Sequence, residues 1–488
     1  MSKLTRRNFV KTTFAAGLAA SVLPTDRVLG ANSDIRIAVV GFNSRGRSLI
    51  GGFNALDGVR VAALCDIDSA VLNRVADGLD KKTKTKVQRY TDIRKLLSNK
   101  NIDAVAFATP VHWNGYGTLL ALDAGKDVYV EKPVCHTLQE GQLMLAAARK
   151  KKLIVQSGTQ NRSDIGMRAV VPDIQGGKLG KIEFIHSYWN RPRGNIGKVT
   201  GPQQPPSTVD YDLYLGPAPK KPMMRKRFHY DWHWQWDYGC GEVCNLGNHQ
   251  IDMARWVAGI DRLPDQTITF GGRAYDDDGQ TPNTMLTAFL YNDNIPIFWE
   301  SRNLPAVPGK RGSDPIMGST AAIYAKCEGG YFVGGRGGGS TYDNAGKLIK
   351  KYPGDGGGRS HLQNFIDAVR SRKHETLRAE IAIGRLSTSM CHLSNISYKL
   401  GKVAAPGDNC YTKQIEALKI NPYFATRWES MQAHLKINKV DTNKTPMLIG
   451  APLQMDAKTE TFTGPAETAK KATALATKDY RAGFTLPG

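Results

Sequence analysis

Two groups of polar side chains in this 488-residue chain have the types and spacing that proton transfer requires. Lys132 follows the apolar run 127–131, and a lysine at the carboxyl end of a buried strand can stabilise a developing alkoxide. Asn245 and His249 are four residues apart, so a helix would place both on one face. His249 could accept a proton, with its pKa in the useful range near neutrality. We therefore predict Lys132, His249 and Asn245 as catalytic residues, with Asp252 at the helix surface or behind the site.

An aromatic segment just upstream has the composition of a carbohydrate site. Residues 227–238 combine tryptophans with histidines, tyrosines and aspartates. Aromatic faces suit the C–H faces of a sugar, and the polar side chains suit its hydroxyls. Alternation in a strand would place the tryptophans on one side and the polar side chains on the other. The predicted substrate-binding residues are His233, Asp237, Trp236, Tyr188 and Arg191.

No metal site is predicted from the seven cysteines. Cys240 and Cys244 are the only close pair, and neither a second pair nor a histidine at finger spacing accompanies them. A site built from His229, His233 and Asp237 is the less favoured alternative.

The scaffold for these side chains begins with a short, β-branched strand, 35–40. It leads into the glycine-rich turn 41–46, and a helical stretch follows from Arg47. This order aims backbone N–H groups and a helix N-terminus at a pyrophosphate. Asn43 replaces the middle glycine of the usual fingerprint, and asparagine tolerates positive φ.

The second strand, 59–65, ends at Asp66. A carboxylate there can bind both ribose hydroxyls of an adenosine and would repel a 2′-phosphate. NAD is therefore favoured over NADP, although Arg45 and Arg47 weaken that preference.

Strands and helices then alternate, which predicts a doubly wound parallel sheet. Further strands are expected at 104–108, 127–131 and 153–157, with helices at 114–124 and after the capping box 137–140. A flavodoxin-like fold without a dinucleotide is the alternative. Glycine-rich segments at 329–339 and 354–358 are expected to be loops.

Three further motifs carry a family resemblance. They are Ala108-Thr109-Pro110-Val111-His112-Trp113, Glu131-Lys132-Pro133 and the run 241–256 that holds Asn245 and His249. The set resembles the glucose–fructose oxidoreductase, inositol dehydrogenase and rhizopine catabolism family (Gfo/Idh/MocA), from about residue 35 to the late helix 392–401. The resemblance implies an N-terminal Rossmann domain, residues 32–158. It also implies a C-terminal α/β domain, residues 159–402, with a large, open, mostly antiparallel sheet.

The resemblance also assigns site residues. In such proteins the substrate lies between the domains, over the nicotinamide, and the Lys132–Pro133 bond is expected to be cis. Asn245 stands where inositol dehydrogenase-like members have aspartate, so a carboxylate that would stabilise a charged His249 is missing. Members often pair through the open sheet, so a homo-oligomer is expected. The implied cofactor-binding residues are Gly41, Asn43, Ser44, Arg45, Gly46, Asp66, Thr109, Pro110, His112, Glu131 and Lys132.

Both ends of the chain extend beyond this resemblance. Arg6-Arg7, a weakly apolar stretch and small residues near 30 predict a twin-arginine export signal over residues 1–31. We therefore expect recognition by the twin-arginine machinery, a periplasmic location and no membrane span in the mature protein. Residues 403–488 are expected to be an extension packed on the substrate domain or a neighbouring subunit, with one helix at 466–476.

The net charge of +22 could indicate an anionic partner. The basic residues are scattered and no nucleic-acid-binding motif accompanies them, so a solvated basic surface is favoured. The leading hypothesis is an exported NAD-dependent oxidoreductase acting on a secondary hydroxyl of a sugar, glycoside or cyclitol, with tightly bound cofactor. One alternative is redox-neutral glycoside cleavage or epimerisation by transient oxidation. Another, from a different class, is a non-catalytic sugar-binding protein on the same fold.

Overall fold

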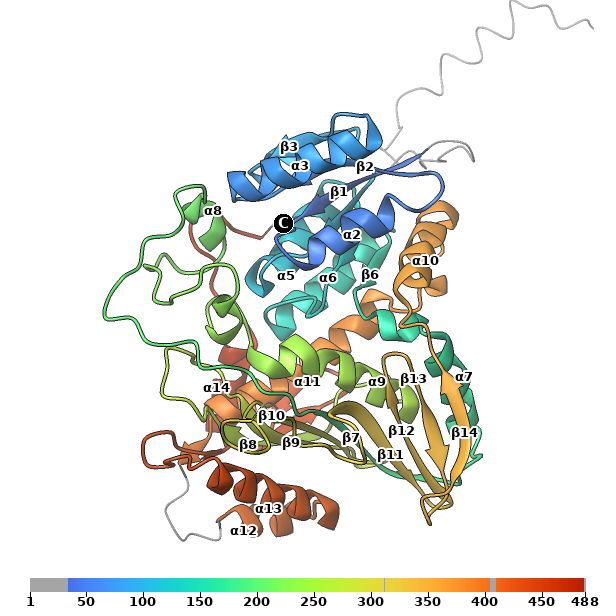
Figure 1. The fold of residues 1–488 in the computed structure, drawn as a ribbon, viewed down its shortest axis with the longest axis vertical. Coiled ribbons are helices and arrows are strands. Elements are labelled where there is room, and N and C mark those ends of the chain that lie inside the picture. Colours follow the sequence, from blue (N-terminus) through green and yellow to red (C-terminus); the bar gives the residue numbers. More distant parts are fainter. Residues whose placement is uncertain (1–33, 311, 404–409, 487–488) are drawn as a thin grey trace, which may run out of the picture. The chain divides into compact units, whose positions relative to one another are not determined.

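The computed structural model describes residues 34–310, 312–403 and 410–486. The predicted export signal at 1–31 lies outside the described residues. Residues 35–488 form one compact unit, which contains two sheets (Figure 1). Among the described residues, no helix is both long enough and apolar enough to cross a bilayer.

The first sheet is parallel, with strand order β3-β2-β1-β4-β5-β6. Strands β1, β4, β5 and β6 are short and almost wholly buried, as expected when helices cover both faces, whereas β2 is partly exposed and the edge strand β3 is mostly exposed. They are β1 (Ile35–Val40), β2 (Val59–Cys65), β3 (Gln88–Tyr90), β4 (Ala104–Phe107), β5 (Asp127–Val130) and β6 (Val155–Ser157). The helices between them are α2 (Arg45–Phe53), α3 (Ser69–Thr83), α4 (Ile93–Leu97), α5 (Val111–Asp123) and α6 (Leu138–Lys151).

Local sequence signals explain these boundaries. Thr137 caps α6 by accepting a hydrogen bond from the Glu140 N–H, as the capping box predicts. The Glu140 carboxylate bonds the N–H of His136 rather than that of the cap residue. The α2 helix begins at Arg45, two residues earlier than expected, because the turn before it is tighter than the sequence indicated. The predicted Rossmann fold is confirmed.

The second sheet is large and mixed, with order β14-β13-β12-β11-β7-β10-β9-β8-β16-β15 and a β17–β18 pair beside β8. Only the β7–β10 pair is parallel, so the predicted mostly antiparallel sheet is confirmed. Its strands are β7 (Ile182–Trp189), β8 (Gln266–Gly272), β9 (Thr284–Leu290), β10 (Ile297–Arg302), β11 (Ala321–Cys327), β12 (Gly330–Gly335), β13 (Gly338–Tyr342), β14 (Leu348–Pro353), β15 (Lys402–Val403), β16 (Leu448–Ile449), β17 (Leu453–Asp456) and β18 (Thr461–Thr463). The β12–β13 hairpin occupies most of the segment expected to be a loop.

Helices cover this sheet on both faces. The face toward the Rossmann domain carries α9 and α11, whose apolar side chains join the main core (Figure 1). The helices of this half are α7 (Ile165–Gln175), α8 (Tyr211–Leu215), α9 (Asn248–Ala258), α10 (Gly358–Ser371), α11 (Ile381–Lys399), α12 (Cys410–Ala417), α13 (Pro422–Ile437) and α14 (Ala466–Leu475). Short 3₁₀ turns occupy Gln160–Ser163, Asp231–Trp234 and His374–Thr376, and a π-helical turn occupies Val243–Gly247.

The C-terminal extension covers the opposite face of the large sheet. Helix α13 buries Phe424, Trp428 and Met431 against the strands. Beneath it Glu300 pairs with Arg302 and with Arg427 from α13. Burial opposes ionisation of Glu300, yet these guanidinium groups hold its pKa well below its usual range. The helix at 466–476 was predicted, whereas α12 and α13 were not. These helices cover part of the sheet face through which the resemblance implied pairing, and the expected homo-oligomer stays a prediction.

The last described residues return to the Rossmann domain. Lys478 and Tyr480 both contact the fully buried carboxylate of Glu140, at 2.6 and 2.8 Å. Phe484 packs edge-on against Trp113 of α5. The segment after α14 therefore joins the two halves of the molecule a second time.

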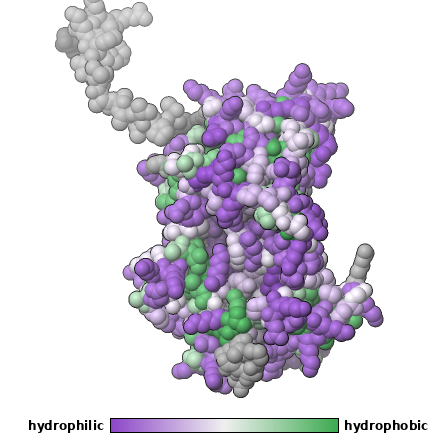
Figure 2. All heavy atoms as spheres, turned by 90° about the vertical axis from the view of Figure 1, so that its left-hand side faces the viewer, coloured by the Kyte–Doolittle hydropathy of each residue, from purple (hydrophilic) through white to green (hydrophobic). Residues whose placement is uncertain are grey.

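One face of the molecule is predominantly hydrophilic (Figure 2). Its hydrophobic residues gather in small separate areas, mainly in the lower half of that view. This agrees, for that face, with the solvated surface expected from the charge.

Replacing Trp428 with alanine should destabilise the protein by about 3 to 5 kcal/mol, the usual result of removing a buried tryptophan. Trp428 is 4% exposed and contacts Phe270 and Tyr411. Denaturant unfolding would measure the change. The control is Ile437→Ala on the same helix, 54% exposed, which should alter stability by less than about 0.5 kcal/mol. Equal effects of the two variants would contradict the packing of α13 on the sheet.

Candidate active site

A pocket of about 480 Å³ lies between the carboxyl ends of the Rossmann strands and the second domain. It extends from Asp66 to His249, so that dinucleotide and substrate positions are continuous. It brings together most of the predicted site residues, namely Gly41, Asn43, Ser44, Arg45, Asp66, Thr109, Pro110, Glu131, Lys132, His233, Asn245 and His249.

The dinucleotide end is built by the turn after β1. Gly41 has φ +74°, and a Cβ there would lie 3.0 Å from the Ala108 carbonyl oxygen. Gly46 does not line the pocket, but a Cβ at Gly46 would lie 2.1 Å from the Gly41 carbonyl oxygen. Glycine is therefore required at both positions, one for the turn and one for the close start of α2.

The Asp66 carboxylate is held in position by backbone N–H groups. Phe42 and Asp68 donate to its two oxygens at 3.0 and 3.1 Å. Burial raises the pKa of Asp66, and these hydrogen bonds oppose the rise. The remaining acceptor capacity of Asp66 faces the pocket, as a ribose site requires.

The two arginines that weakened the NAD preference do not form a 2′-phosphate site. Arg45 pairs with Glu131 at 2.8 Å, so its charge is already matched. Arg47 is exposed on α2 and does not line the pocket.

Lys132 connects the two halves of the site. It precedes Pro133 through a cis peptide bond, as the resemblance implied. Its ammonium donates to the Asn245 carbonyl oxygen at 2.5 Å. Burial lowers the pKa of Lys132, while Glu131 and Glu242 act in the opposite direction. The lysine is thus a half-buried cation aimed at the centre of the pocket.

Asn245 and His249 reach the pocket by a different geometry from the one expected. Asn245 lies in the π-helical turn Val243–Gly247, and α9 begins only at Asn248. The backbone carbonyl group of Asn245 consequently accepts the hydrogen bond from Lys132, and the residue acts through its backbone rather than through its side chain. π-Helical turns inside helices are frequent at functional sites.

His249 is neutral at physiological pH. Burial holds its pKa well below the usual range, and the cations Lys132, Arg45 and Arg336 act in the same direction. The expectation of a pKa near neutrality is therefore wrong. Nδ1 of His249 is buried and has no hydrogen-bond partner among the described residues, while the residue itself lines the pocket.

The aromatic segment is not a strand. Residues Asp231–Trp234 form a 3₁₀ turn, and the chain then doubles back, so that strand alternation does not apply. His233 lines the pocket, stacked on Trp232 at 3.6 Å between ring centroids. Burial lowers the pKa of His233 to about 3, so it too is neutral.

Two predicted substrate residues of this segment lie elsewhere. Trp236 lies under the Lys399 ammonium, 4.0 Å from its ring centroid. Asp237 pairs with Lys221 at 2.8 Å. Neither lines the pocket.

Three other predicted residues have structural positions outside the pocket. His112 is fully buried and bonds the Tyr214 carbonyl oxygen at 2.8 Å, and burial lowers its pKa to about 3. Tyr188 lies on the sheet face under α13, where its hydroxyl donates to Ile316 O at 2.8 Å. Arg191 donates to Thr320 and stacks over Trp189.

Asp252 is neither at the helix surface nor in the pocket. It is fully buried and pairs with Arg162 at 2.8 Å. Ser387 of α11 also donates to it, at 2.7 Å. Asp252 therefore anchors α9 against its neighbours.

Sequence reasoning missed two arginines that line the pocket, Arg193 and Arg336. Arg193 pairs with Glu242 at 3.1 Å and donates to the Tyr230 hydroxyl at 2.9 Å. Arg336 reaches the pocket from the β12–β13 hairpin. The sequence signal for Arg336 was its position as a single arginine within a run of glycines, because such a run can form a tight hairpin that carries the charge.

Two family models match this chain. An oxidoreductase family model with an NAD-binding Rossmann fold matches residues 35–159, and the model of the same family's C-terminal α/β domain matches residues 188–420. The chain belongs to the Gfo/Idh/MocA oxidoreductase family. Membership confirms the two-domain architecture and NAD as the cofactor of this fold.

Among the relatives found by sequence comparison are proteins with glycosidase names. A glycosyl hydrolase family 109 protein of Shewanella baltica is 30% identical over 215 residues, which cover 38% of this chain and 47% of the relative. An α-N-acetylgalactosaminidase of Shewanella oneidensis is 26% identical over 217 residues, with the same coverage. The match thus spans about half the length of these relatives.

Solved structures share the fold at low sequence identity. An oxidoreductase from Agrobacterium radiobacter, in complex with NAD+, L-tartaric acid and magnesium, is 15% identical with a TM-score of 0.54. The similarity covers 74% of this chain and 94% of that one.

Replacing Asp66 with serine should weaken NADH binding at least about tenfold, because a charge-assisted hydrogen bond contributes about 1.5 kcal/mol or more. Binding of NADPH should fall less, since the repelling charge is gone. Titration of nucleotide fluorescence measures both. Asp123→Asn, at an exposed position in the same domain, should change neither dissociation constant. An unchanged NADH affinity in the Asp66 variant would refute its assignment to the ribose.

The pH profile of kcat/KM should be shifted to the acid side. His249 must be neutral to accept a proton, so activity is lost as pH falls through its pKa, which lies well below 6.5. Lys132 must be charged, so activity is lost as pH rises through its pKa, which lies below 10.5. His249→Asn should abolish the acid limb and lower kcat/KM by about 10² to 10⁴. An acid limb centred at or above pH 6.5 would contradict this assignment.

Proposed function

We propose that this protein is an exported NAD-dependent enzyme that cleaves a glycosidic bond through transient oxidation of a neighbouring secondary hydroxyl. The observation that carries the proposal is the single pocket joining Asp66 to Lys132, Asn245, His233 and His249. The glycosidase names of the relatives support hydrolysis of a glycoside over net oxidation.

The residues at the dinucleotide end fit NAD. Gly41 and Gly46 leave space that any side chain would fill, and Asp66 offers an oriented carboxylate. When bound, NAD supplies a reversible hydride acceptor, which takes a hydride from a carbinol carbon and later returns it.

The chain's own groups supply the proton chemistry. His249, which is neutral and lines the pocket, accepts the proton of the substrate hydroxyl. Lys132, fixed by Asn245, stabilises the oxygen as negative charge develops on it and holds the ketone that results. The hydride and the hydroxyl proton leave together, so the oxidation step balances.

A ketone in the ring makes cleavage of the neighbouring glycosidic bond easier. It acidifies the hydrogen on the adjacent carbon, and His233, which is neutral and lines the pocket, is placed to take that proton. The glycosidic oxygen then leaves from the next carbon, and a double bond forms between the two carbons. Tyr230, whose hydroxyl accepts from Arg193, is available in the pocket to protonate the leaving oxygen. Water then adds across the double bond, with its hydroxyl going to the glycosidic carbon and its proton to the adjacent carbon. Bound NAD would supply the reduction that restores the alcohol, so the cycle would cause no net redox change.

The twin arginines Arg6-Arg7 are the observation behind export. Outside the cytoplasm free NAD is scarce, so a cycle that regenerates the oxidised cofactor in place suits that compartment. Net oxidation of a sugar or cyclitol is the second candidate, because Lys132 and His249 would serve it equally well.

The test is a panel of aryl and natural glycosides in deuterated water. The expected result is aglycone release with no lasting 340 nm absorbance, and deuterium at the carbon next to the oxidised one. Lys132→Met should lose this activity, while Lys81→Met, on exposed α3, should keep it. Stoichiometric NADH without cleavage would favour net oxidation. Sugar binding with neither NADH nor cleavage would favour a non-catalytic binding protein.

A further inference from the structure

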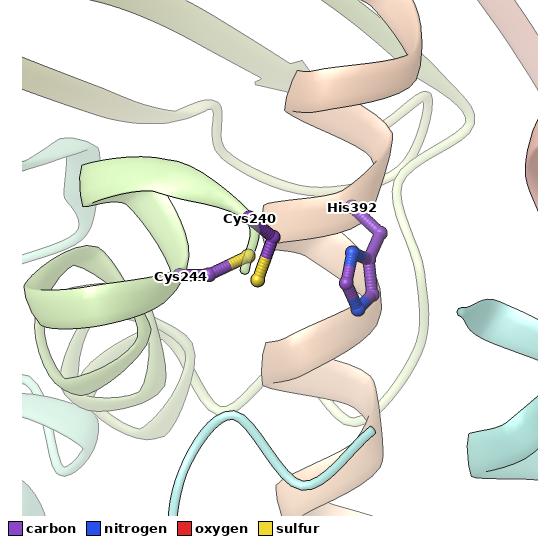
Figure 3. A group of neighbouring side chains, drawn as sticks. All are labelled: Cys240, Cys244 and His392. Carbon is purple, nitrogen blue, oxygen red and sulfur yellow. The ribbon is translucent and has the colours of Figure 1, made fainter. Parts of the chain in front are cut away.

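Three buried donor groups meet directly behind the π-helical turn of the active site. Cys240, Cys244 and His392 each offer one ligand atom, and these atoms all lie within 4.8 Å of one another. The three residues are 4%, 1% and 5% exposed. Figure 3 shows the two sulfur atoms directed toward each other, with the imidazole of α11 facing them.

The environment of His392 fixes the tautomer that binds metals. Its Nε2 lies 3.0 Å from the Cys135 carbonyl oxygen. A carbonyl oxygen only accepts, so Nε2 carries the hydrogen and Nδ1 keeps its lone pair. Donation of the second ring N–H to a backbone carbonyl is the arrangement that orients histidine ligands in metal sites.

The thiols also have a polar support. The Asn395 side-chain amide, 3% exposed, donates to the Cys240 carbonyl oxygen at 2.8 Å and lies 3.8 Å from the Cys244 sulfur. Beside Cys240, a cavity of about 40 Å³ is lined by polar groups that include Lys132 and Asn114.

We propose that Cys240, Cys244 and His392 bind one zinc ion. Two thiolates and an imidazole form a donor set that prefers zinc, and the C-x₃-C spacing falls within the range of structural zinc sites. Tetrahedral Zn–S bonds of about 2.3 Å and Zn–N bonds of about 2.0 Å place the donors about 3.5 to 3.8 Å apart. The donor atoms, which lie within 4.8 Å of one another, would therefore have to move roughly 1 Å closer together to bind the ion.

The ion would fix the turn on which the catalytic centre is built. Cys244 lies in the π-helical turn next to Asn245, Cys240 ends the aromatic segment, and His392 lies in α11. One ion would join all three segments behind the Asn245 carbonyl group that holds Lys132. The zinc site is thus a structural element and does not depend on which sugar is the substrate.

The full-length chain, produced with zinc in the medium, should carry about one zinc per chain by elemental mass spectrometry. Cys244→Ser and His392→Ala should each lower this content at least about tenfold. Asn395→Ala should weaken zinc affinity by about 10- to 100-fold, as expected for a residue that supports a ligand. Cys327→Ser, a buried cysteine at the end of β11, is the matched control and should keep the zinc.

A second measurement separates metal loss from misfolding. Cobalt added to the chelated wild-type chain should give thiolate-to-metal charge-transfer bands, which should be absent in Cys244→Ser and present in Cys327→Ser. Absence of zinc and of cobalt bands in the wild-type chain would overturn the proposal. So would equal zinc in all variants, which would mark adventitious binding. A mass lower by two hydrogens, mapped to a Cys240–Cys244 disulfide, would replace the metal site by a redox pair.

Discussion

The active site depends on one hydrogen bond between the two domains, from the Lys132 ammonium to the Asn245 carbonyl oxygen. On one side, β5 delivers the lysine to the carboxyl edge of the parallel sheet. On the other side, the π-helical turn directs the Asn245 carbonyl group outward, whereas in a regular α-helix this group would bond an N–H of the same helix. Because a half-buried ammonium needs an acceptor, the relative position of the domains and the charge state of the lysine are fixed together.

Several cations lie around the pocket, and two of the carboxylates beside it are already paired. Glu131 pairs with Arg45 and Glu242 with Arg193. Burial above all, and then the positive charges of Lys132, Arg45 and Arg336, hold the pKa of His249 low, so the histidine stays neutral. The loss of the aspartate at position 245 is consistent with that environment, since a neutral imidazole needs no carboxylate to stabilise it.

The elements that could be predicted were those with a local signal. The parallel strands and the Thr137 cap follow from short apolar runs and a capping pair. The prediction of a strand in the aromatic segment was wrong because tertiary packing, rather than alternation of side chains, shapes this segment. A Cβ at Gly239 would lie 2.6 Å from the Trp232 and His233 carbonyl oxygens, which shows that the chain folds back on itself there. The prediction that Tyr188 binds substrate was wrong because the sequence did not reveal α13, which covers the face of β7 on which Tyr188 lies. Cys244 and His392 meet through contacts between distant segments, which spacing alone does not reveal.

The segment after α14 acts as a second tether across the cleft. Any opening of the cleft that moves α6 away from this segment must separate Glu140 from Lys478 and Tyr480, and breaking a buried ion pair of this kind costs about 3 kcal/mol or more. Added to the barrier for escape, that cost lengthens the residence time of a bound nucleotide by about two orders of magnitude. The tail would thereby make a diffusible coenzyme behave as a prosthetic group, through kinetics and without adding a single contact to it.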